Sequence, residues 1–381
     1  MAGNVRELAG VFFRLGATSF GGPAAHIANM YRELVERRKW LDRQTFLDLV
    51  GASNLVPGPT STEVAIHVGY YRAGWVGLVV AGACFIVPAV CIVLALAFVY
   101  VRFGTLPQMG WMLYGVKPVI LAIVAQALWG FGKTALKGWS TNLAAGFVLV
   151  GSLLGFQELA LLFVAGAGVM LAANWRRLGG TASMLAPFPL LPLGAEAATA
   201  VTGSVPPTLW AVTLFFLKVG SVLYGSGYVL LAFLQGDLVE RWGWITSRQL
   251  LDAIAVGQFT PGPVFTTATF IGYLVGGVSG SLMATLGIFL PSFLFVGLLN
   301  PLIPRMRQSL WLGTFLDGVN AASLGLMAAV TIGLGRAALT DWITWGLALV
   351  SLAVLIRFKI NSAWLVLAGG VAGWLVSGIG L

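Results

Sequence analysis

Long apolar stretches, separated by short interruptions, occupy almost the whole chain. In the first half they cover about residues 5–30, 44–71, 74–101, 109–132, 142–155 and 159–173. Each stretch predicts helix, but the first two contain internal breaks, at Gly21-Gly22-Pro23 and at Pro57-Gly58-Pro59. Proline removes a backbone donor and clashes with the preceding turn, and glycine permits any turn. A regular helix is therefore not expected to continue through either break.

The Pro57-Gly58-Pro59 break leaves two arms of about 13 and 12 residues, each too short to cross about 30 Å of hydrocarbon. A re-entrant hairpin is the simplest structure for this stretch. Broken backbone at membrane depth is tolerated only where it is buried in protein or lines a wet cavity. The break therefore predicts a cavity, and a functional site is expected there.

The second half of the chain repeats the first. Pro261-Gly262-Pro263 follows Pro57-Gly58-Pro59 by 204 positions, and the same offset pairs Gly21 with Gly225, Trp40 with Trp244 and Asp48 with Asp252. After the hairpin the offset becomes 203, as in the pair Pro88 and Pro291. The match has no gap over about fifty residues up to the hairpin and includes rare residue types, which indicates an internal duplication. It divides the chain into a first repeat at 1–174, a linker at 175–208 and a second repeat at 209–381.

The basic residues gather at different places in the two repeats. The first repeat concentrates them around Arg37-Arg38-Lys39, whereas the second has Arg305 with Arg307 and Arg357 with Lys359. Because cytoplasmic loops are enriched in Lys and Arg, this shift predicts that the repeats are inverted. The expected fold is an all-α polytopic membrane protein of two inverted repeats with broken or re-entrant helices. It has about ten membrane crossings plus two re-entrant hairpins, and both termini lie outside.

Composition supports a membrane protein and excludes several functions. The chain of 381 residues is 58% hydrophobic and 9% charged, whereas soluble domains carry about 25% charged residues. The net charge of +9 is assigned to loops that orient the chain in the bilayer, not to nucleic-acid binding. Its two His and two Cys residues match no metal-ligand spacing, and no phosphate-binding loop or catalytic nucleophile context is visible. We therefore predict a protein that is not an enzyme and has no cofactor.

The breaks supply the first candidate site residues. Inverted repeats with broken helices place a substrate near the midplane, where the N-termini of half-helices face anionic groups. Hydroxyl residues follow both Pro-Gly-Pro motifs at the expected helix starts. The candidates are Gly21, Gly22, Pro57, Gly58, Pro59, Thr60, Ser61 and Thr62 in the first repeat, and Pro261, Gly262, Pro263, Thr266 and Thr267 in the second.

Ionisable residues inside apolar segments supply the rest, because such residues are costly in a membrane. Arg14 and Lys218 match at offset 204 and would attract a compact dianion, unless they reach toward the interface instead. Lys117 interrupts a span and is also included. Glu63 and His67 have no ionisable counterparts in the second repeat and are candidates for proton coupling. The alternative is that Glu63 pairs with Arg14 or Lys117.

Several of these motifs resemble one protein family. Phe20-Gly21-Gly22-Pro23-Ala24-Ala25-His26-Ile27, Leu55-Val56-Pro57-Gly58-Pro59-Thr60-Ser61-Thr62, Gly225-Ser226-Gly227-Tyr228 and Phe259-Thr260-Pro261-Gly262-Pro263 are similar to the chromate ion transporter family in its long form with two fused domains. The resemblance implies a secondary transporter that exports chromate across the bacterial inner membrane and confers chromate resistance. The partners expected are a chromate- or sulfate-like oxyanion and the lipid bilayer, with a homodimer left open.

Three other functions are alternatives to chromate export. The residue pattern does not separate chromate from sulfate, so the chain could import or exchange sulfate or another oxyanion. A passive anion channel is distinguished by flux that never runs uphill. An intramembrane enzyme is disfavoured by the lack of a nucleophile with a neighbouring base.

Overall fold

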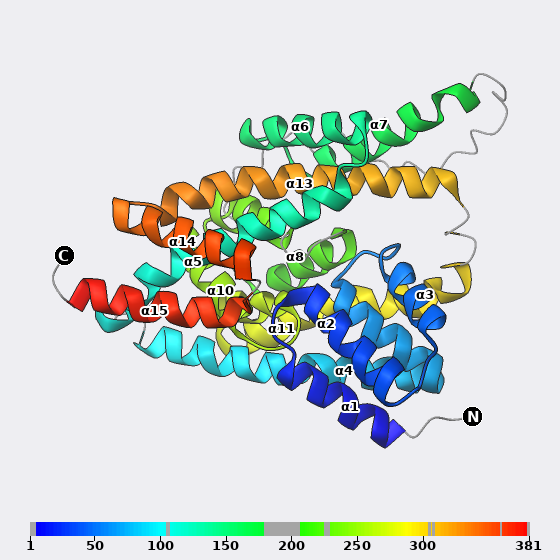
Figure 1. Cartoon of the computed structure of the whole chain (residues 1–381), viewed down its shortest axis with the longest axis horizontal. Coiled ribbons are helices and arrows are strands. Elements are labelled where there is room, and N and C mark those ends of the chain that lie inside the picture. Colours follow the sequence, from blue (N-terminus) through cyan, green and yellow to red (C-terminus); the bar gives the residue numbers. More distant parts are fainter. Residues whose placement is uncertain are drawn as a thin grey trace.

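The computed structural model describes residues 5–103, 107–178, 206–224, 229–303, 306, 309–358 and 360–378, which are helical with short connections and contain no strand (Figure 1). The first half comprises α1 (Val5–Thr18), α2 (Gly22–Tyr31), a π-helical segment (Arg32–Arg37), α3 (Arg43–Ser53), α4 (Thr60–Phe103), α5 (Pro107–Ala135), α6 (Trp139–Leu153) and α7 (Glu158–Leu178). The second half comprises α8 (Leu209–Val222), α9 (Leu230–Phe233), a π-helical segment (Leu234–Arg241), α10 (Ser247–Phe259), a 3₁₀ turn (Val264–Thr266), α11 (Thr267–Leu299), a second 3₁₀ turn (Asn300–Leu302), α13 (Leu310–Ala338), α14 (Trp342–Phe358) and α15 (Ser362–Gly378).

The helix breaks predicted from Pro and Gly at residues 19–21, 54–59 and 260–263 are present. The chain also reverses inside α4, where Ala73 and Gly74 leave helical geometry, Gly74 with φ 58° and ψ −146°. Gly69 and Gly77 are so close across this turn that neither has room for a Cβ. Residues eight apart in a continuous helix would be separated by about 12 Å. Each of α4 and α11 is therefore a helical hairpin, and α11 turns at Gly276-Gly277.

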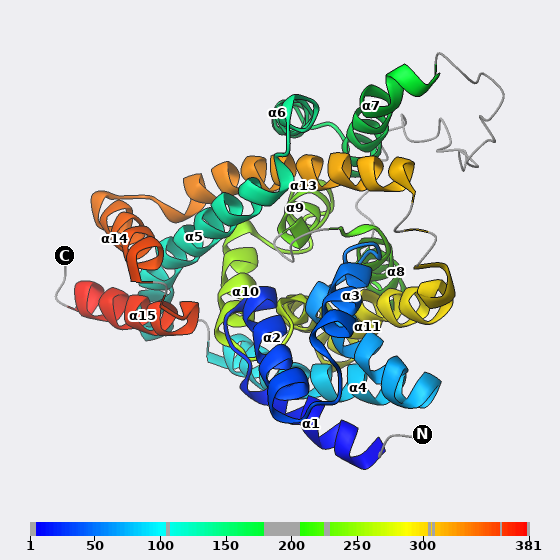
Figure 2. The same cartoon turned by 45° about the vertical axis from the view of Figure 1, so that its right-hand side comes forward.

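The two halves exchange helices (Figures 1 and 2). Helix α5 of the first half packs along α14 and α15 of the second, while α13 packs along α6 and α7 of the first. The contacts repeat at the sequence offset, because Gly115 packs against Gly369 just as Gly318 packs against Gly166. Glycine at all four positions lets the backbones approach closely.

The equivalent helices α5 and α13 run antiparallel to each other. Leu324 of α13 lies against Gly132 near the end of α5, and Leu121 near the middle of α5 lies against Gly335 near the end of α13. These two contacts are also related by the offset of 203. The halves therefore meet about an approximate two-fold axis.

The outer surface is apolar in the manner of a membrane protein. Five described helical stretches are long and apolar enough to cross a membrane: 60–103, 110–135, 158–175, 264–299 and 310–338. Along α11 a stripe of exposed leucines recurs at every fourth position, namely Leu282, Leu286, Leu290, Leu294 and Leu298. Such a stripe outside a buried core is suited to lipid. The protein is a multi-pass membrane protein.

Candidate functional site

The two Pro-Gly-Pro loops meet the helix breaks of the opposite repeat. The Gly58 amide donates to the Leu223 carbonyl over 2.7 Å, and the Gly262 amide donates to the Ser19 carbonyl over 2.8 Å. Leu223 and Ser19 are themselves equivalent at offset 204 and follow α8 and α1. Each Pro-Gly-Pro loop is thus bonded to a helix break of the other repeat, and the two bonds are related by the repeat offset. We call the four breaks that these two bonds join the crossing.

Glycine is required in both loops. Gly58 has φ 141° and Gly262 has φ 91°, values that side-chain-bearing residues rarely adopt. Gly262 also packs against Ala89 and the Gly16 carbonyl, and Gly58 packs against Ser292 and Glu63. The flanking prolines need no amide partner, so the loops are buried without orphaned donors at those positions.

The hydroxyl residues after the two loops behave differently. Helix α4 begins at Thr60, and the Ser61 hydroxyl lies 3.2 Å from Nδ1 of His26, whose Nε2 lies 3.1 Å from the Ser19 carbonyl. Thr62 is fully buried, and its hydroxyl has no hydrogen-bond partner in the described part of the chain. In the second repeat, Thr266 and Thr267 both donate to backbone carbonyls in their own turn, over 2.8 Å. The Thr266 and Thr267 hydroxyls are therefore occupied by their own turn, whereas the Thr62 hydroxyl is not.

A carboxylic acid lies at the crossing on the same side. Glu63 is fully buried, and its carboxyl group faces the hydroxyl of Ser292, which is also fully buried. No described Lys or Arg lies within ion-pair distance of Glu63. At the repeat offsets, Glu63 corresponds to Thr267 and Ser292 corresponds to Ala89. The contact between a carboxyl group and a hydroxyl is therefore not repeated at the equivalent positions. His67 is buried one helical turn beyond Glu63.

The two predicted cations are each paired with a carboxylate of their own repeat. Arg14 contacts Glu33, and Nζ of Lys218 lies 2.8 Å from Asp237. Both carboxylates are nearly or fully buried, whereas Arg14 is about half exposed and Lys218 about one-third. The sequence analysis missed Glu33 and Asp237, although they too are related by the offset of 204. Each repeat therefore holds a partly exposed cation paired with a buried carboxylate of the same repeat.

Lys117 is also paired. Its Nζ lies 3.6 Å from Asp252, which accepts a 2.8 Å hydrogen bond from Tyr100. Neither Glu63 nor Arg14 contributes to this cluster, so Lys117 stabilises the junction of α4, α5 and α10.

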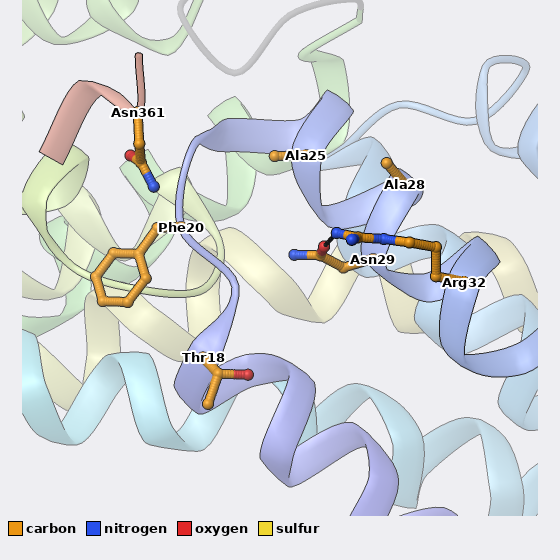
Figure 3. A pocket seen from close by; sticks show the side chains of 7 residues that line it. All are labelled: Thr18, Phe20, Ala25, Ala28, Asn29, Arg32 and Asn361. Carbon is orange, nitrogen blue, oxygen red and sulfur yellow. Dashed lines mark hydrogen bonds between the residues drawn. The ribbon is translucent and has the colours of Figure 1, made fainter. Parts of the chain in front are cut away.

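Two adjoining cavities open beside the break between α1 and α2. The larger, about 630 Å³, is lined by Arg14 and by Arg32, Glu33, Glu36 and Arg37 among others. The smaller, about 380 Å³, contains Phe20, Asn29, Arg32 and Asn361 (Figure 3). Residues 57–59 and 261–263 line neither of these two spaces, so the cavity expected at the Pro-Gly-Pro breaks stays a prediction. Gly21 and Gly22 form the left-handed turn at their edge, while Gly225-Ser226-Gly227 lies outside the described residues.

Comparison with known proteins identifies the family. The model of a family described as chromate transporter matches residues 6–172 and 210–374, one match for each half. The chain belongs to the chromate transporter family. It is 35% identical to a chromate transport protein of Cupriavidus metallidurans over 98% of this chain and 93% of that protein. It is 32% identical to a probable chromate transport protein of Synechococcus elongatus over 92% and 89%, and 31% identical to a chromate transport protein of Pseudomonas aeruginosa over 96% and 91%. No solved structure matches the chain.

Proposed function

We propose that this protein is a secondary active transporter that exports chromate across the bacterial inner membrane, conferring chromate resistance, by alternating access between two inverted repeats. The observation that carries the proposal is the crossing of four helix breaks, joined by the bonds from Gly58 to Leu223 and from Gly262 to Ser19. In transporters of this architecture, broken helices at a repeat interface form the substrate site. The names of the chromate transport proteins supply the substrate.

The antiparallel packing of α5 and α13 supports inversion, because equivalent membrane-spanning helices of inverted repeats run in opposite directions. Helix α3 has 11 residues and is about 16 Å long, which is too short to span about 30 Å. It therefore forms a re-entrant hairpin with the first arm of α4. The same arrangement in the second half completes about ten crossings and two hairpins.

A tetrahedral dianion fits the groups at the crossing. The N-terminus of α4 at Thr60 carries a partial positive charge, with Ser61 and Thr62 in its first turn. Arg14 and Lys218 add charge, each released from its carboxylate when the dianion arrives. Glu33 keeps its ion pairs with Arg37 and Arg38, and Asp237 keeps Arg241, so neither buried carboxylate is left unpaired during transport.

Glu63 carries the coupled proton in this scheme. A buried carboxyl group beside a hydroxyl and without a paired cation is most stable when it is neutral. Exposure to water during alternating access would allow it to ionise, so that proton movement follows the conformational cycle. His67, on the same face one turn away, is placed to relay that proton.

The test is radiolabelled chromate flux in everted vesicles and in proteoliposomes with an imposed proton gradient or membrane potential. We expect uphill accumulation in everted vesicles, at least a tenfold loss for Arg14→Gln and Lys218→Gln, and little change for Arg102→Gln at the exposed end of α4. Glu63→Gln should retain counterflow but lose its dependence on the proton gradient. Flux that never runs uphill would identify a channel, and transport in the inward direction with sulfate preferred would identify an importer.

A further inference from the structure

The smaller cavity beside α2 has the chemistry of an anion site. Arg32 and Asn29 line one side, Asn361 lines the other, and none of the described lining residues is a carboxylate (Figure 3). Arg32 donates to the amide oxygen of Asn29, whose amide nitrogen donates to the Ser19 hydroxyl over 3.3 Å. The oxygen of Asn361 caps α15 by accepting a 3.0 Å hydrogen bond from the Ala363 amide, and the amide nitrogen of the same side chain is turned toward the cavity in Figure 3. The wall therefore presents the Arg32 guanidinium and the Asn361 amide as its donors.

The internal repeat shows what occupies the equivalent place in the other half. At the sequence offsets, Arg32 corresponds to Gly236 and Asn361 corresponds to Glu158. The equivalence holds in space, because both Asn361 and Glu158 stand at the start of the helices that the halves exchange, α15 and α7. The second half thus replaces a cation by glycine and an amide by a carboxylate.

Glu158 fills the space that the missing side chain leaves. Its Oε1 packs directly on Gly236, where a Cβ could not be accommodated. The carboxyl group also lies in the electrostatic field of Asp237 and of the cations that pair with it, Lys218 and Arg241. The protein itself therefore places a carboxyl group at this position in one repeat and leaves a cavity at the matching position in the other.

We propose that the cavity formed by Asn29, Arg32 and Asn361 is an oxyanion-binding vestibule on the path to the crossing, and that the carboxyl group of Glu158 occupies and closes the matching vestibule of the second repeat. The inference rests on the proposed function, because it takes the substrate to be an oxyanion. The larger cavity adjoins the vestibule through Arg32 and leads to Arg14. An anion bound at Arg32 would therefore lie beside the cavity that Arg14 lines.

The test exchanges the two side chains. Asn361→Asp copies the charge of Glu158 into the vestibule and keeps the helix cap, because Asp caps as well as Asn does. Radiolabelled chromate binding to the purified full-length protein should weaken at least tenfold in Kd. Asn361→Ser, a neutral cap that lacks the amide donor, should weaken binding less than Asn361→Asp does. Thr208→Asp places the same new charge at the exposed cap of α8 and should leave Kd unchanged.

The reciprocal double variant, Glu158→Ala with Gly236→Arg, removes the carboxyl group from the second vestibule and supplies the cation that the first vestibule has, so it should add one bound chromate per chain. An unchanged Kd in Asn361→Asp, or no added binding in a folded double variant, would overturn the assignment. If either of these results is found while the wild-type protein still binds chromate, the vestibule assignment fails but the proposed function is unaffected. Wild-type protein that binds no oxyanion and shows no counterflow would overturn both.

Discussion

Replacing Lys117 by Met should destabilise the protein without removing a substrate ligand. Lys117 is 11% exposed, Asp252 is 1% exposed, and their charged atoms lie 3.6 Å apart. At an effective dielectric constant of about 20, two unit charges at that distance attract by about 4.6 kcal/mol. Part of this attraction offsets the cost of burying both charges. Because Tyr100 and Arg248 still interact with Asp252, we expect Lys117→Met to cost about 3 kcal/mol, the lower end for a broken buried pair.

The assay is reversible unfolding in mixed detergent micelles, followed by tryptophan fluorescence, for a double-mutant cycle. Lys117→Met and Asp252→Asn each leave one charge without its buried partner. The double variant removes both of these charges, so its free energy of unfolding should recover to within about 1 kcal/mol of the wild type. Lys133→Met, an exposed lysine of the same helix, is the control and should change stability by about 0.5 kcal/mol or less. Additive losses in the double variant would refute the pairing. A stable double variant that no longer transports would return Lys117 to the substrate site.

Two further predictions concern the Pro-Gly-Pro loops and the π-helical segment Arg32–Arg37. Gly262→Ala should lower the free energy of unfolding by more than Gly22→Ala does. Both variants lose about 1–2 kcal/mol because the backbone is left-handed, but only the new Cβ at 262 meets a neighbour, Ala89, at 2.8 Å. Equal free energies of unfolding for the two variants would contradict this packing. Burial alone would raise the pKa of Glu33, but the hydrogen bond from Arg38 and the charges of neighbouring arginines outweigh it and hold the pKa below its ordinary value of 4.5. The ionised Glu33 therefore contributes its full stabilisation above pH 4.5, and this stabilisation is lost as the pH falls through the lower pKa of the folded state. In thermal unfolding scans between pH 7 and pH 3, the melting temperature of Glu33→Gln should depend less on pH than that of the wild type.

The helix breaks could be predicted because their cause is local. Proline and glycine act within one or two residues, so the ends of α1 and α3 and the start of α4 at Thr60 follow from the sequence. The exchange of helices could not be predicted in this way. Nothing near Gly115 in the chain indicates that it packs on Gly369, because that contact depends on a surface supplied by the other half.

The candidate site was predictable in its cations and not in their partners. Arg14 and Lys218 stand out because they interrupt apolar helices, but Glu33 and Asp237 lie in segments with many charges and give no comparable signal. Thr267 illustrates the opposite error: its position after a break suggests a ligand, yet its hydroxyl is used by the local turn. A side chain's position along the chain sets what it can reach, and the packed neighbours determine what it bonds to.

The exchange of α14 and α15 for α6 and α7 has a consequence for how the bundle is completed. A lone repeat would expose the flank of α5 that α14 and α15 cover here, so a chain with one repeat would need a second copy to close its bundle. A chain that holds both halves closes the bundle by itself. Each position can then differ between the halves, as Glu63 and Glu158 do.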